Sequence, residues 1–147
     1  MVPDEYGPLS GRFEYFDHAA DVGIRVAASS VPELFVTAGR ALMEWMGPAP
    51  LEGELSEHDL SLQADDLEDL LVRWLQELLY LFTQRHAYFI EAREITVDRA
   101  GLQARLRCRH WDETDYENFQ EVKAITYHKL RITREESGWS AHVIVDV

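Results

Sequence analysis

The sequence has little cysteine, no long apolar run and few basic residues. Its single cysteine, Cys108, excludes an intramolecular disulfide and a zinc site built from several cysteines. The most apolar segment, near residues 70–82, is interrupted by Arg73, Gln76 and Glu77, so no segment is suited to crossing a bilayer. The first residues lack the basic and apolar regions of a secretory signal. These absences predict a cytoplasmic protein that does not associate with membranes.

Positive charge is scarce, because 14 Lys and Arg stand against 27 Asp and Glu, for a formal net charge of −13. A surface this acidic repels a phosphate backbone at long range, so we expect no strong direct binding to nucleic acid. The same charge suits a cation ligand or a basic protein partner, and it also fits a simply well-solvated surface.

Length and turn residues predict the domain organisation. Residues 1–12 contain Pro3, Gly7, Pro8 and Gly11 without any hydrophobic period, which predicts a flexible N-terminal arm. Residues 13–147 are 135 residues without a linker or a repeat, enough for one domain with a full core.

Two segments have the period of an amphipathic helix. One begins at Ser30, with Glu33 three residues later, and ends at Gly47. The other begins at Asp65 and continues to Arg85. Strand patterns occupy residues 51–63, 88–97, 102–109 and 121–128, with an acidic loop at 110–120, and residues 130–145 predict a closing hairpin over a turn at 135–138. The predicted fold class is α+β: a single compact domain with two amphipathic helices packed on a largely antiparallel β-sheet.

Three arginines, Arg105, Arg107 and Arg109, alternate along one face of the strand at 102–109. Two interpretations stay open from the sequence. The face is an exposed sheet surface protected from aggregation by charge, or it is a docking strip for an acidic partner or an RNA phosphate.

Residues 13–24, FEYFDHAADVGI, place Asp17, His18 and Asp21 in a bend between two apolar runs. Carboxylate oxygens with one imidazole form a plausible half of a metal site. The best candidate for the other half is the final strand, VIVDV, where Asp146 stands beside the terminal carboxylate of Val147. Two anions this close repel unless a cation lies between them. We therefore expect Asp146 and Val147 to meet Asp21 in space.

Three segments together resemble the archease family: FDHAADVGI at 16–24, EVKAITYH at 121–128, and a final strand with Trp-Ser-Ala followed by VIVDV. The resemblance covers about residues 13–147. It implies an accessory protein, not an enzyme, that serves as protein cofactor of the RNA-splicing ligase RtcB. Such a cofactor promotes guanylylation of the ligase and multiple turnover in tRNA splicing or RNA repair.

The resemblance also implies a divalent metal site at Asp21, Asp146 and Val147, with His18 and Lys123 as neighbours. Ligands that are all oxygen favour calcium, manganese or magnesium over zinc. From the residues alone, two other functions stay open: a metal-dependent phosphoesterase and a general chaperone-like binding module. A hydrolase also needs an open metal position and a base for water, and no glycine loop suited to holding phosphate accompanies the acids.

Overall fold

The computed structural model describes residues 11–18, 20–99 and 101–147, with only the backbone described at Asp17 and His18. The predicted arm at residues 1–12 lies almost entirely outside these residues and stays a prediction. The elements, in chain order, are β1 Arg12–His18, β2 Asp21–Ala28, α1 Val31–Met46, β3 Leu55–Gln63, α2 Leu67–Arg85, β4 Ala87–Val97, β5 Gly101–His110, α3 Glu113–Tyr116, β6 Ala124–Ile125, β7 Arg131–Glu135 and β8 Gly138–Asp146.

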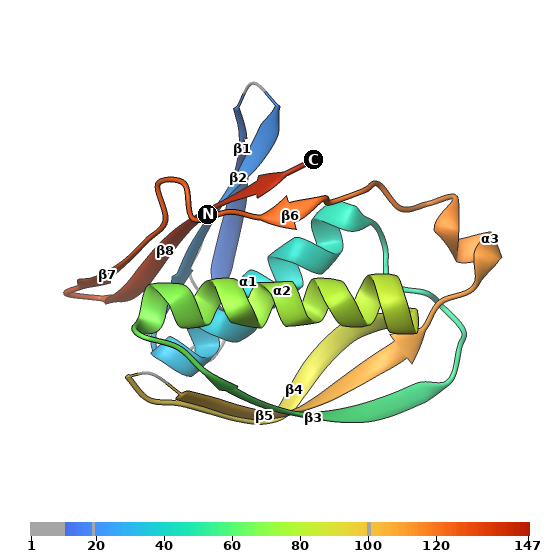
Figure 1. Cartoon of the computed structure of the whole chain (residues 1–147), viewed down its shortest axis with the longest axis horizontal. Coiled ribbons are helices and arrows are strands. Elements are labelled where there is room, and N and C mark those ends of the chain that lie inside the picture. The colour runs from blue at the N-terminus through green and yellow to red at the C-terminus, as the bar shows by residue number, and fades with distance from the viewer. Residues whose placement is uncertain (1–10, 19, 100) are drawn as a thin grey trace.

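The molecule has three layers, with α1 and α2 between two antiparallel sheets (Figure 1). The first sheet has the strand order β1-β2-β8-β6, with β7 also paired to β8, and the second has the order β3-β5-β4. The predicted α+β class with two helices on antiparallel structure is confirmed. The strands form two sheets where the sequence predicted one, because the helices carry enough apolar surface to cover a sheet on each side.

Both helices begin at polar caps. The hydroxyl of Ser30 accepts a hydrogen bond from the Glu33 backbone N–H, as the sequence predicted for α1. The N-cap of α2 is Asp66, whose carboxylate accepts from the Asp69 backbone N–H at 2.8 Å. The predicted start at Asp65 is therefore wrong by one residue, because two adjacent aspartates, Asp65 and Asp66, can each act as an N-cap.

Three predicted boundaries differ from the structure. The strand expected from residue 51 begins at Leu55, because Gly53 has a φ of 130°, which interrupts extended backbone. The acidic loop at 110–120 contains the short helix α3, which begins with a capping box between Asp112 and Asp115. The strand expected over 121–128 is reduced to β6, Ala124–Ile125. The predicted hairpin of β7 and β8 is confirmed.

Trp74 lies at the centre of the middle layer. Its side chain is fully buried, and its indole N–H donates to the Phe35 carbonyl of α1 at 2.7 Å. Its ring meets the ring of Phe89, on β4, edge to face at 5.7 Å. One side chain thus joins both helices to the second sheet. Within the described residues, no helix is long and apolar enough to cross a membrane.

We expect Trp74→Ala to lower the free energy of unfolding by about 3–5 kcal/mol, because it removes a large buried ring and leaves a cavity between the layers. Urea denaturation followed by circular dichroism measures the change. Tyr80→Ala on the same helix is the matched control, since Tyr80 is 49% exposed. A loss at Trp74 no greater than the loss at Tyr80 would contradict this assignment of the core.

Candidate metal and partner site

The register between β2 and β8 brings Asp21 and Asp146 face to face. The two residues are directly opposite in the antiparallel pairing, which places their Cβ atoms ~4.5–5.5 Å apart. Both are half-buried, and the Oδ1 atom of Asp21 is buried. They lie on the face of the first sheet that points away from the helices, since the alternate residues Val22 and Val145 belong to the core. We call Asp21 and Asp146 the facing pair.

The other predicted neighbours also converge on the facing pair. The backbone of His18 pairs with Asp21 across β1 and β2, while its side chain lies outside the described residues. Lys123 donates its backbone N–H to the Asp146 carbonyl at 2.8 Å, and Val147 follows Asp146 directly. The structure therefore gathers segments that are more than 100 residues apart in the sequence at one corner of the sheet.

The chemistry of this corner fits a hard divalent cation. Two carboxylates from facing strands and a main-chain oxygen of Val147 offer oxygen ligands only, the donor type that calcium, magnesium and manganese prefer. Across residues 11–18, 20–99 and 101–147, no three His, Cys, Asp or Glu side chains come together as a ready metal site. A cation here would need the Val147 main chain or water to complete its shell, and metal binding stays a prediction.

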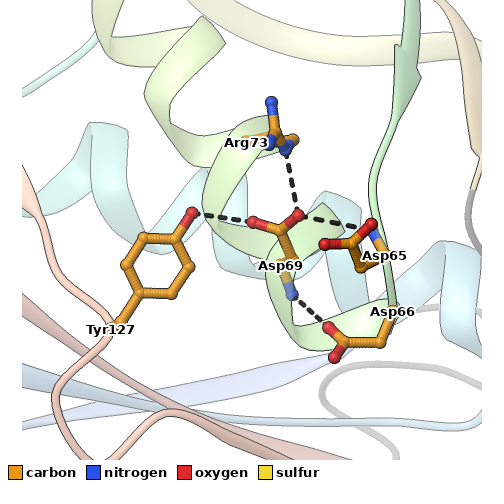
Figure 2. Close-up of polar contacts among 5 residues, drawn as sticks. All are labelled: Asp65, Asp66, Asp69, Arg73 and Tyr127. Atoms are coloured by element: carbon orange, nitrogen blue, oxygen red, sulfur yellow. Dashed lines mark hydrogen bonds and ion pairs between the residues drawn. The ribbon is translucent and has the colours of Figure 1, made fainter.

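A hydrogen-bonded network fixes the segment that follows Lys123 (Figure 2). The Tyr127 hydroxyl donates to one oxygen of Asp69 at 2.7 Å, and Arg73 donates to the other oxygen at 3.1 Å. On the other side, Thr126 donates both its backbone N–H and its hydroxyl to the Ile144 carbonyl. The segment 123–127 is thus bonded to β8 and to the first turn of α2.

The same network accounts for much of the acidic start of α2, where Asp65, Asp66, Glu68 and Asp69 lie close together in the sequence. Asp66 caps the helix, and Asp69 also accepts the backbone N–H of Asp65 (Figure 2). Tyr127 first, and Arg73 second, lower the pKa of Asp69 from its ordinary value. Of these carboxylates, Asp66 is engaged in capping the helix and Asp69 in holding the segment 123–127.

The three arginines of β5 do not form an uncompensated basic strip. Arg105 donates to the Asp59 carboxylate at 3.0 Å, and the register places Arg107 between Glu57 and Glu91 of the flanking strands. Arg109 donates to the carbonyl of Gly53. Cross-strand pairs of opposite charge stabilise a sheet surface. The structure therefore favours the interpretation of a charged, exposed sheet face over a docking strip for phosphate.

Sequence reasoning missed Thr126 and Tyr127 as parts of this site. Their segment, EVKAITYH, was interpreted as an ordinary strand, although β6 covers only Ala124–Ile125. A tyrosine placed directly after a short apolar run, in a chain with an unusually acidic helix start, is the only signal the sequence offers. It does not indicate which acid the hydroxyl meets.

Comparison with known proteins identifies relatives over nearly the whole length. A sequence model of the archease protein family matches residues 13–147. A protein archease from Methanosarcina barkeri is 32% identical over 143 residues, covering 92% of this chain and 96% of that protein. A protein archease from Pyrococcus furiosus is 31% identical over 140 residues, covering 92% of this chain and 99% of that protein.

Solved structures have the same architecture. The solution structure of a Methanobacterium thermoautotrophicum protein superposes with a TM-score of 0.71 at 28% identity, covering 92% of this chain and 98% of that one. The crystal structure of an archease from Thermotoga maritima, described as a possible chaperone, has a TM-score of 0.62 at 20% identity and covers 91% and 96%. The second likeness, at this low identity, concerns the fold alone.

We expect Tyr127→Phe to raise the pKa of Asp69 toward the ordinary aspartate value, because it removes the hydrogen bond that lowers this pKa most. A pKa lowered by folding stabilises the protein above the unfolded pKa, and this stabilisation is lost as the pH falls through the folded value. The variant should therefore lose less stability on acidification. Carboxyl NMR titration measures the pKa, with Tyr80→Phe as control, and an unchanged Asp69 would contradict the network.

Proposed function

Because the chain belongs to the archease family, we propose that it is the protein cofactor of an RtcB-type RNA ligase in the cytoplasm. In this role it promotes guanylylation of the active-site histidine of the ligase and thereby permits multiple turnover in tRNA splicing or RNA repair. It acts as an accessory protein, and the ligase supplies the nucleophile and the bond-forming chemistry.

The observation that supports this proposal most is the convergence of the three family segments on one corner. The segments around Asp21, Lys123 and Asp146 are joined by the β2–β8 register and by the hydrogen bond from Lys123 to Asp146. Lys123 is exposed while the facing pair is half-buried. This corner can therefore present a cation and an ammonium group together to a partner surface.

The proposal includes a divalent ion held by Asp21, Asp146 and a main-chain oxygen of Val147. When bound, the ion neutralises the facing carboxylates and supplies positive charge at the sheet corner. The work of the chain's own residues is to hold this corner rigid, through the pairing of β8 with both β2 and β6. A rigid preformed corner lowers the ordering cost of docking to the ligase.

The first test uses purified protein, an RNA with a 3′-phosphate, GTP and manganese. Alone, the protein should give neither ligation nor phosphate release. Added to the RtcB-type ligase, it should raise the number of turnovers while leaving single-turnover sealing by preguanylylated ligase nearly unchanged. Product formation without the ligase would overturn the accessory role in favour of a metal-dependent phosphoesterase. Stimulation that is equal for unrelated aggregation-prone enzymes would indicate a general chaperone-like module instead.

The second test concerns the ion. Asp21→Asn and Asp146→Asn should each weaken manganese and calcium binding by about tenfold or more, since each removes a charged ligand. Neither should lower the metal-free stability much, because facing carboxylates repel each other. Isothermal titration calorimetry measures the affinity, with Asp65→Asn as the matched control at the start of α2. Unchanged affinity at Asp21 with a loss at Asp65 would move the site to that helix.

The same titration examines Val147. A residue appended after Val147 replaces its carboxylate with a peptide carbonyl, and deletion of Val147 removes the group. We expect both changes to weaken ion binding, and the deletion to weaken it more. Full affinity after deletion would exclude Val147 as a ligand while leaving the facing pair in place.

A further inference from the structure

The outward face of the first sheet contains a hollow of about 510 Å³. It lies over β1, β2, β8 and β7, on the side away from the helices, and it is separated from the facing pair by Phe16, Gly23 and Ile144. Its size is within the range of small-molecule sites. We call it the sheet hollow.

Side-chain length gives the sheet hollow its shape. Two small residues, Ala27 and Ser140, are directly opposite each other on the two central strands, β2 and β8, and lie among the lining residues. Long side chains stand on the outer strands, with Arg12 on β1 and Arg131 on β7. Three strand spacings separate β1 from β7, which is about 14 Å. The hollow is therefore a shallow floor between two arginine rims.

The end of the sheet hollow nearest the facing pair is stiff. The ring of Phe16 lies across Gly23, where a Cβ would collide with it. The same ring packs against the ring of His142, with centroids 4.7 Å apart, and under the Arg25 guanidinium at 4.7 Å. His142 is 8% exposed and lines the hollow. The side chains at this end therefore do not have to be ordered when a ligand binds.

The charges of the sheet hollow differ from those of the rest of the surface. Arg25 is paired with Glu14 at 2.8 Å. Among the residues that the structure describes, Arg12 and Arg131 form no ion pair, although both line the hollow. Glu135 is a second acid on the lining. In a chain with a net charge of −13, three arginines around one hollow are a local excess of positive charge.

We propose that the sheet hollow binds a small diphosphate-type anion, such as inorganic pyrophosphate or the diphosphate group of a free nucleotide. Guanidinium groups form bidentate hydrogen bonds with phosphate oxygens. Arginines on opposite rims suit a ligand with two linked anionic groups better than a single phosphate, which one arginine could hold. The Ser140 hydroxyl on the floor offers a further polar contact.

A long nucleic acid is a poorer ligand for this hollow. The arginines of the sheet hollow span only a few strand widths, and the acidic surface beyond them repels an extended phosphate backbone. A diphosphate concentrates its charge within the hollow and avoids that repulsion. This inference is independent of the proposed function, because binding is measured directly on the protein without a ligase.

The experiment is an NMR titration of the metal-free, isotope-labelled full chain with pyrophosphate. We expect saturable shifts at Arg12, Ala27, Ser140 and Arg131. Arg12→Gln and Arg131→Gln should each weaken binding by about tenfold or more, since each removes a charge-assisted contact. Arg107→Gln, on the outer face of the second sheet, is the matched control and should leave the affinity unchanged.

A steric variant separates a specific site from general charge attraction. Ala27→Leu keeps every charge but fills the floor, so it should abolish the shifts while the melting temperature stays near that of the parent chain. Absence of saturable binding, or equal weakening by Arg107→Gln, would overturn the proposal. Tighter binding of a 3′-phosphorylated oligonucleotide than of pyrophosphate at the same residues would overturn the assignment to a free diphosphate. Orthophosphate should bind more weakly than pyrophosphate, and equal affinity would contradict the two-rim arrangement.

Discussion

The antiparallel register between β2 and β8 is the constraint on which the rest of the structure depends. It buries Ile24 against Val143 on the helix side and, by the same alternation, sets Asp21 against Asp146 on the outward side. A slip of one residue would turn the buried valine outward and separate the carboxylates. The apolar core therefore fixes the position of polar groups that contribute nothing to the core.

The three-layer arrangement leaves two outer sheet faces, and their charge patterns differ. Because the helices face a sheet on each side, the outer faces of the two sheets carry the extended charged patterns (Figure 1). On the second sheet, Arg105 and Arg107 of β5 are matched by acids of β3 and β4, and Arg109 donates to the Gly53 carbonyl. On the first sheet, the facing pair lies at one end, and the sheet hollow, lined by three arginines and by the acids Glu14 and Glu135, lies at the other. Arg12 and Arg131 form no ion pair among the described residues and can attract an anion, whereas matched charges mainly stabilise the sheet.

The periodic parts of the fold could be predicted from the sequence. The stripe from Leu70 to Phe82 and the alternation from Leu102 to Cys108 each correspond to a buried face in the structure. The meeting of Asp21 with Asp146 followed from the repulsion between neighbouring anions, and the β2–β8 register agrees with it. The second sheet could not be predicted, because the periodicity of a strand shows which face is buried but not which strand pairs with it. The sheet hollow was also missed, since Arg12 and Arg131 are distant in sequence and share no motif.

The segment 123–127 shows why a short strand can still be a fixed part of a site. Strand β6 pairs only two residues with β8, which alone gives little stability. Thr126 adds two hydrogen bonds to β8, and Tyr127 adds one to the first turn of α2. The helix start is held in turn by its own cap at Asp66. The position of Lys123 beside Asp146 therefore depends on contacts in two layers, the first sheet and the helices. A substitution at the start of α2 can for this reason displace Lys123 without altering any residue of the sheet corner.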